Sequence, residues 1–136
     1  MQINIKLDPG AMMPIKAHEH DAGFDLYAVK VIDGYYRVNI HTGVHVQIPP
    51  GYVGLLCERS SSMDIGVSLK NKIGVIDAGY TGEIIIRSEK STLRIPHPGD
   101  KVAQLVMLPI PQVELVQVDS LDDTERGSNG FGSSDL

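Results

Sequence analysis

Two stretches of the sequence combine residue types that could bind a phosphate-bearing molecule or hydrolyse it. The first is ERSSSMDIG, in which Arg59 and three serine hydroxyls precede a short stretch of helical character. A helix N-terminus offers unpaired N–H groups, and an arginine can donate two parallel hydrogen bonds to phosphate oxygens. The stretch fits an anion site, and it also fits an ordinary serine N-cap beside a surface arginine.

The second stretch is GVIDAGYTGE, which places a carboxylate at the end of an apolar strand. Asp77 closes the strand, Ala78-Gly79 form a turn signal, and Tyr80 follows. A carboxylate next to a tyrosine suits a general base beside a ring-shaped substrate. An Asx-type turn with a half-buried tyrosine explains the same residues equally well.

Other common site types are absent from the sequence. It holds no P-loop motif and no glycine-rich dinucleotide fingerprint. His18 and His20 of HEH lack a cysteine pair or an evident third metal ligand. The single cysteine, Cys57, rules out an internal disulfide. A formal net charge of −5 without a run of Lys or Arg argues against nucleic acid or an anionic membrane as a partner.

The elements that must position these residues are predicted to be strands. In GVHVQIPPG, Val44 and Val46 share one face while His45 and Gln47 share the other, which predicts a solvent-facing His45. The stretches QINIKL, YYRVNI and VELVQV also favour strands, and EIIIRS and VAQLVMLPI suit strands buried on both faces. About ten short strands between Gly, Pro and Asp turn signals predict an all-β sandwich or jelly roll. Only SSSMDIG is helical in character, with a serine cap and a glycine stop.

The length of 136 residues fits one domain. The N-terminus lacks the basic-then-apolar layout of a signal peptide, so we expect the whole chain to be the mature protein in a cytoplasmic environment.

Residues 127–134 hold three glycines and three serines around Phe131. Composition alone makes this a disordered tail, which leaves the phenylalanine unexplained.

Five stretches together resemble the motifs of the trimeric dUTPases, in the same order. They are DAGFDLYA (21–28), ERSSS (58–62), NKIGVIDAGYTGEI (71–84), GDKVAQL (99–105) and RGSNGFGSS (126–134). The resemblance spans nearly the whole chain. It implies a single domain (1–136) with a distorted jelly-roll fold, one short helix and a flexible glycine-rich arm. It also implies Mg²⁺-dependent hydrolysis of dUTP to dUMP and pyrophosphate, which limits uracil in DNA and supplies dUMP for thymidylate synthesis.

The resemblance also implies a role for each motif residue. The third motif would form a β-hairpin, with Asn71 and Gly74 next to the uracil and Tyr80 against the deoxyribose. Asp77 would deprotonate the water that attacks the α-phosphorus. Arg59, Ser60 and Ser61 would hold the phosphates from a neighbouring subunit, Gln104 would add a hydrogen bond, and Asp25 would contact Mg²⁺ through water.

The arm, residues 122–136, is implied to be a mobile lid over the nucleotide. Phe131 would stack on the uracil, Arg126 would reach the γ-phosphate, and Ser128 would add a phosphate contact. The implied assembly is a homotrimer with shared sites. Glu58 departs from the common glycine or proline of the second motif and brings a negative charge near the phosphates.

Two other functions are compatible with parts of the same sequence. A dCTP deaminase shares the fold, but it needs a glutamate where this chain has Arg87, and arginine cannot shuttle protons. A regulatory binding protein switched by nucleotide would also use this fold. Since Asp77, Tyr80, Arg126 and Phe131 are all present, the sequence favours the hydrolase.

Overall fold

The computed structural model of the chain describes residues 1–135. It contains nine strands and two short 3-10 helices: β1 (Asn4–Leu7), β2 (Gly23–Tyr27), β3 (Lys30–Asp33), β4 (Arg37–His41), β5 (Val44–Gln47), β6 (Tyr52–Cys57), η1 (Met63–Ile65), β7 (Gly74–Ile76), β8 (Ile85–Glu89), β9 (Lys101–Pro109) and η2 (Ser133–Asp135). This content confirms the all-β prediction. No helix within the described part of the chain is both long and apolar enough to cross a membrane.

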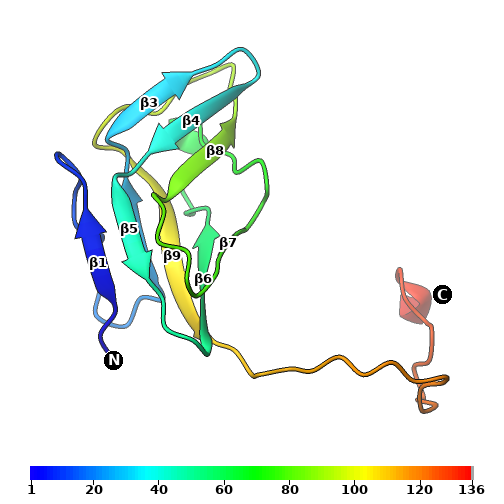
Figure 1. Cartoon of the computed structure of the whole chain (residues 1–136). Helices are drawn as coiled ribbons and strands as arrows, with labels where there is room; N and C mark the ends of the chain where they lie inside the picture. Colours follow the sequence, from blue (N-terminus) through cyan, green and yellow to red (C-terminus); the bar gives the residue numbers. More distant parts are fainter. Residues whose placement is uncertain (136) are drawn as a thin grey trace.

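The strands form three antiparallel sheets (Figure 1). One has the order β2-β9-β6-β7, one has the order β3-β4-β8, and β1 pairs with β5 alone. The buried core lies between these sheets and is made of aliphatic side chains such as Leu26, Ile40, Val44, Ile86 and Val102. Alternation places them inward, because successive side chains of a strand point to opposite faces.

Two details of the strand prediction were wrong. EIIIRS is buried on one face only, since Ile86 and Ser88 are buried while Ile85, Arg87 and Glu89 are exposed. VELVQV forms no strand at residues 113–118. Figure 1 shows why: the chain leaves the sheets after β9 and runs away from them, so this segment has no strand beside it to pair with.

The helix predicted from SSSMDIG is a single 3-10 turn at Met63–Ile65. Gly66 ends it with a left-handed backbone (φ 77°), as the glycine stop predicted. Ser62 does not cap it through its side chain. Its Oγ instead accepts a hydrogen bond from the N–H of Arg59 at 2.8 Å, which fixes the backbone where the second motif begins.

Candidate active site

The central sheet brings three of the predicted site residues together at one place. In the β2–β9 register Asp25 lies opposite Gln104, and in the β6–β9 register Gln104 lies opposite Cys57. Arg59 follows two residues after Cys57. Residues from the first, second and fourth motifs therefore meet although almost 80 positions separate Asp25 from Gln104 in the sequence.

Asp25 is the buried centre of this group, with 7% of its surface exposed. Its Oδ1 accepts a hydrogen bond from Arg59 Nε at 2.7 Å, and its Oδ2 lies 3.0 Å from Lys101 Nζ. Arg59 also donates through Nη1 to Ser61 Oγ at 3.1 Å. Because a guanidinium carries five N–H donors, Arg59 is held in place while several donors stay available for an anion.

Lys101 was not among the predicted site residues. It belongs to the GDKVAQL stretch, and its position three residues before Gln104 was the only signal. Two cations now lie against one carboxylate, so the group holds one more positive than negative charge. A local cationic site in a chain of net charge −5 suits an anionic ligand.

Gln104 and Glu58 brace the backbone of the second motif. Gln104 donates through Nε2 to the carbonyl of Glu58 at 2.9 Å. The Glu58 carboxylate accepts a hydrogen bond from the N–H of Leu69 at 2.7 Å. The charge at this departure from the family pattern is therefore bonded to the segment that leads into the third motif.

The third motif is not a β-hairpin, so that prediction was wrong. β7 pairs with β6, with Gly74 opposite Leu56, and the next strand, β8, pairs with β4 in another sheet. Gly74 is buried, and a Cβ there would lie 2.9 Å from the Leu56 Cβ and 3.6 Å from Asn71 Nδ2. A side chain at this position would collide with β6, so the glycine is needed for strand packing as well as for any close ligand.

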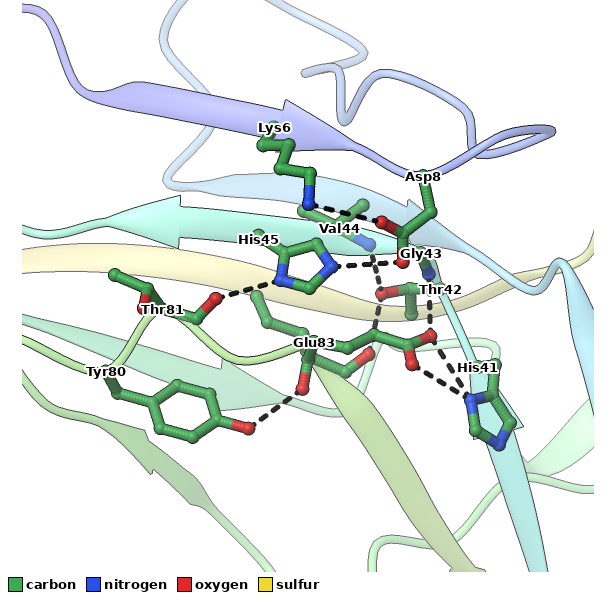
Figure 2. A network of polar contacts seen from close by, with 11 residues as sticks. Lys6, Asp8, His41, Thr42, Gly43, Val44, His45, Tyr80, Thr81 and Glu83 are labelled. Atoms are coloured by element: carbon green, nitrogen blue, oxygen red, sulfur yellow. Dashed lines mark hydrogen bonds and ion pairs between the residues drawn. The ribbon is translucent and has the colours of Figure 1, made fainter.

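Asp77 and Tyr80 lie together on the turn after β7. The N–H of Tyr80 donates to the carbonyl of Asp77 at 3.1 Å, and Gly79 has a left-handed φ of 92°. The Tyr80 hydroxyl donates to the carbonyl of Glu83 at 3.0 Å (Figure 2). Within residues 1–135 the Asp77 carboxylate has no hydrogen-bond or ion-pair partner, and it is exposed, so it can accept a proton from water.

A hollow of about 350 Å³ lies beside Asn71. Its walls are Arg37, Leu56, Leu69, Lys70, Asn71, Ile85 and Arg87. A volume of this order is at the small end of ligand sites, and an amide over an apolar floor suits a flat polar ring.

The arm residues lie apart from both groups in this structure (Figure 1). Phe131 is fully exposed and has a left-handed φ of 53°. Arg126 donates through Nε to the carbonyl of Asn129 at 2.9 Å, so the arm closes a local turn on itself. The structure does not bring Arg126, Ser128 and Phe131 to Asp77 or Arg59.

No group of three or more His, Cys, Asp or Glu side chains that could hold a metal exists in the described residues. Asp25 can contribute to a metal site indirectly, through a metal-bound water. Each of its oxygens is bonded to one cation, and a carboxylate oxygen has room for a second hydrogen bond from a metal-bound water. Such an acceptor suits Mg²⁺ bound through its water shell, with most of the metal's ligands supplied by a substrate.

Comparison with known proteins identifies the family. The dUTPase family model matches residues 10–135. The deoxyuridine 5'-triphosphate nucleotidohydrolase of Mycobacterium leprae is 42% identical over 142 residues, covering 96% of this chain and 92% of that protein.

Solved structures agree with the sequence comparison. Staphylococcus bacteriophage 80alpha dUTPase with dUPNHPP, from work on phage dUTPases that control transfer of virulence genes by a proto-oncogenic G protein-like mechanism, superposes with a TM-score of 0.81 at 33% identity over 98% of each chain. A mutant dUTPase from phage phi11 of S. aureus, solved to show the coordination of a structural Mg(II) ion, gives 0.74 at 30% identity, covering 90% of this chain and 100% of that one. These neighbours confirm the dUTPase-like jelly roll, and the chain belongs to the dUTPase family.

Proposed function

We propose that this protein hydrolyses dUTP to dUMP and pyrophosphate. The observation that carries the proposal is the match to the dUTPase family over residues 10–135. The M. leprae relative is named for this activity, and the 80alpha neighbour was solved with the nucleotide dUPNHPP. The cationic group around Arg59 and the unpartnered Asp77 supply the two chemical functions that such a reaction needs.

Asp77 is the general base of the proposed reaction. Its carboxylate takes a proton from a water molecule, and the water oxygen forms a bond to the α-phosphorus. The bond from the α-phosphorus to the bridging oxygen breaks, and pyrophosphate leaves with that oxygen. A general base of this kind contributes about 10²–10⁴-fold to a rate.

Arg59, Ser60 and Ser61 bind the phosphates, and Gln104 completes this group. Arg59 arrives pre-oriented by Asp25, so little side-chain entropy remains to be lost on binding. Gln104 holds the Glu58 carbonyl and thereby the backbone that carries Arg59. Bound Mg²⁺ would neutralise phosphate charge, and Asp25 is the residue that would hold it through water.

Asn71, Gly74 and Tyr80 select the nucleoside. The hollow beside Asn71 receives the uracil, and backbone at Gly74 approaches it closely. Tyr80 packs against the deoxyribose and leaves no room for a 2′-hydroxyl. These roles follow from the family resemblance, and the placement of Asn71 and Gly74 beside Leu56 is compatible with them.

The arm and the assembly complete the proposed site. Residues 122–136 close as a lid, with Phe131 on the uracil and Arg126 and Ser128 on the phosphates. The protein forms a homotrimer in which each site combines residues of neighbouring subunits. The extended course of the arm away from its own sheets supports this arrangement (Figure 1). Location in the cytoplasm stays a prediction of the sequence.

A second candidate function is regulation by protein binding, because work on the 80alpha neighbour describes phage dUTPases that control gene transfer.

The experiment that separates the two functions is pyrophosphate release with Mg²⁺ from dUTP, dCTP, dTTP and UTP in parallel. Release from dUTP alone supports the proposed hydrolase. Binding of dUTP without release from any nucleotide would support the regulatory alternative instead.

A further inference from the structure

A histidine of β5 contacts the segment that carries Tyr80. His45 lies in β5 with its Nδ1 2.8 Å from the carbonyl oxygen of Thr81. Its Nε2 lies 3.0 Å from Asp8 Oδ2 (Figure 2). The sequence pattern placed His45 on the outer face of β5, and the alternation of burial confirms this, with Val44 and Val46 buried on the other face. Its side chain is nevertheless only 19% exposed, because these two partners cover it.

Both partners of His45 are acceptors, which determines its protonation state. A backbone carbonyl cannot donate, and neither can an ionised carboxylate. A neutral imidazole carries only one N–H, so it would leave one of the two short contacts as lone pair against lone pair. Only the imidazolium donates to Thr81 and Asp8 together.

The charges around His45 favour the same state. The hydrogen bond to Asp8 is the largest cause that raises the pKa of His45, and the Thr81 carbonyl adds to it. The hydrogen bond from His45 lowers the pKa of Asp8. Lys6, directly across from His45 in the β1–β5 register and 3.9 Å from Asp8, opposes the charge on His45 more weakly.

Further contacts fasten the same segment on its other side. The Glu83 carboxylate accepts a hydrogen bond from the N–H of Gly43 at 2.9 Å and lies 3.0 Å from His41 Nδ1. The Glu83 carbonyl in turn receives the Tyr80 hydroxyl. The Tyr80 side chain is thus held by the backbone carbonyl of Glu83. The Tyr80 backbone is held through Thr81, the next residue in the chain (Figure 2).

We propose that doubly protonated His45 is a positioning residue, which fixes Tyr80 for the sugar of the substrate by holding the Thr81 carbonyl. The inference rests on the proposed function, since the contact of Tyr80 with deoxyribose belongs to it. Affinity for dUTP and discrimination against UTP therefore decrease when His45 loses its proton.

The sign of the pH effect follows from the two shifts. As pH rises through the raised pKa of His45, the ring becomes neutral and one contact is lost. As pH falls through the lowered pKa of Asp8, the carboxylate is protonated and the pair is lost from the other side. Between these two pKa values His45 makes both hydrogen bonds, and Tyr80 is held in position. Of the two pH limits, the alkaline one lies within reach of a KM assay.

Two substitutions of His45 separate its two hydrogen bonds. In His45→Asn the amide nitrogen takes the place of Nδ1, so it keeps the bond to Thr81 and loses Asp8. In His45→Gln the amide nitrogen takes the place of Nε2, so it keeps Asp8 and loses Thr81. The matched control is His18→Gln, which removes an exposed histidine 3.1 Å from Asp21.

KM and kcat for dUTP and UTP are measured against pH for each variant. We expect His45→Gln to raise KM for dUTP about fivefold with kcat nearly unchanged, the size of effect of one hydrogen bond. His45→Asn should keep most of the affinity for dUTP that His45→Gln loses. Neither variant should show the rise in KM at alkaline pH that the unsubstituted protein shows. The dUTP-to-UTP ratio of kcat/KM should decrease with the affinity.

If a His45 variant fails to fold, two further experiments still test the inference. One is the substitution Asp8→Asn, and the other is nuclear magnetic resonance of the His45 imidazole nitrogens. Asp8→Asn should move the alkaline rise to lower pH. The spectrum should show both His45 nitrogens protonated at neutral pH, whether or not dUTP is hydrolysed. A neutral His45, or KM values and pH profiles equal in all variants, would overturn the inference while leaving dUTP hydrolysis intact. An unsubstituted protein that releases no pyrophosphate would instead refute the proposed function.

Discussion

At the scale of single residues, the surroundings of Asp25 set the character of the site. The family resemblance implied a carboxylate facing a metal through water. The structure adds that Arg59 and Lys101 already bond it from two sides. Removing one partner of a buried carboxylate is costly, so Asp25, Arg59 and Lys101 form one structural unit. In the proposed site, this unit would orient donors toward phosphate.

Asp77 allows a test of the chemistry separate from binding. We expect Asp77→Asn to reduce dUTP hydrolysis by at least about 100-fold, because an amide cannot take the proton from water. The dissociation constant for dUTP should stay nearly unchanged, since Asp77 bonds no described side chain. Pyrophosphate release and calorimetric titration measure the two quantities. The matched control is Asp119→Asn, an exposed aspartate that precedes the arm. Equal loss of binding and turnover would indicate a structural role for Asp77.

Glu58 has a structural role that the sequence did not predict. Glu58→Ala leaves the N–H of buried Leu69 without its partner and should lower the free energy of unfolding by about 1–3 kcal/mol. Glu58→Gln keeps an acceptor oxygen and should cost less. Urea unfolding of both variants gives the comparison. Equal losses in the two would show that the charge, and not the hydrogen bond to Leu69, is what matters.

At the scale of elements, β6 lies between the two strands that carry Gln104 and Gly74, which belong to the two proposed binding groups. It pairs with β9 on one side, which carries Gln104, and with β7 on the other, which carries Gly74. Arg59 follows its end directly. The register of this one strand therefore fixes how each chain presents its phosphate-binding and its nucleoside-binding residues to the neighbouring subunits of the proposed trimer.

Gly54 in the middle of β6 makes this packing testable. A Cβ at Gly54 would lie 2.8 Å from Ile48 Cδ1 and 3.2 Å from both Ile76 Cβ and Leu105 Cδ1. We expect Gly54→Ala to lower the free energy of unfolding by about 1–3 kcal/mol, as overpacking of a core does. Gly130→Ala, where a Cβ meets nothing within 4 Å, is the control. If both variants unfold at the same denaturant concentration, β6 is not tightly packed there.

At the scale of the whole molecule, the arm is separate from the body in this structure. Its residues 122–135 pair with no strand of their own chain, and Phe131 is fully exposed. Ordering a glycine-rich segment costs about 1–2 kcal/mol per residue, so only a ligand that contacts many of its residues can hold it closed. This is the physical basis of the proposed lid.

Truncation before Arg126 tests the lid. We expect a folded protein with an unchanged melting temperature, because the removed residues contribute nothing to the core. Turnover of dUTP should decrease at least about tenfold, since closure orders the substrate and excludes water. Phe131→Ala should show a part of the same loss. An unaffected rate in the truncated protein would refute the lid.

Shared sites can be tested by mixing two inactive variants. Within residues 1–135 no hydrogen bond or ion pair joins Arg59 or Asp25 to Asp77 or Tyr80. If neighbouring subunits supply Arg59 and Asp77 to one site, Arg59→Ala and Asp77→Asn subunits refolded together should recover about a quarter of full activity. Size-exclusion chromatography with light scattering checks the trimer. No recovery from mixed trimers would place each site within one chain.

The sequence by itself determined the family and the all-β class, and it supplied the candidate residues for the proposed chemistry. These properties are local, since each motif lies within a few consecutive positions and strand alternation has a period of two. It also predicted the glycine that ends η1, because a left-handed backbone position favours glycine wherever it occurs.

Only the tertiary structure decided which side chains contact one another. Asp25 meets Lys101 and Gln104 through the β2–β9 register, Glu58 turns to Leu69, and His45 bridges Asp8 and Thr81. The alternating stretch at 113–118 forms no strand because a strand needs a neighbour that its own sequence cannot supply. Such pairings depend on which strands lie side by side, and that is set by the packing of the whole chain around one core.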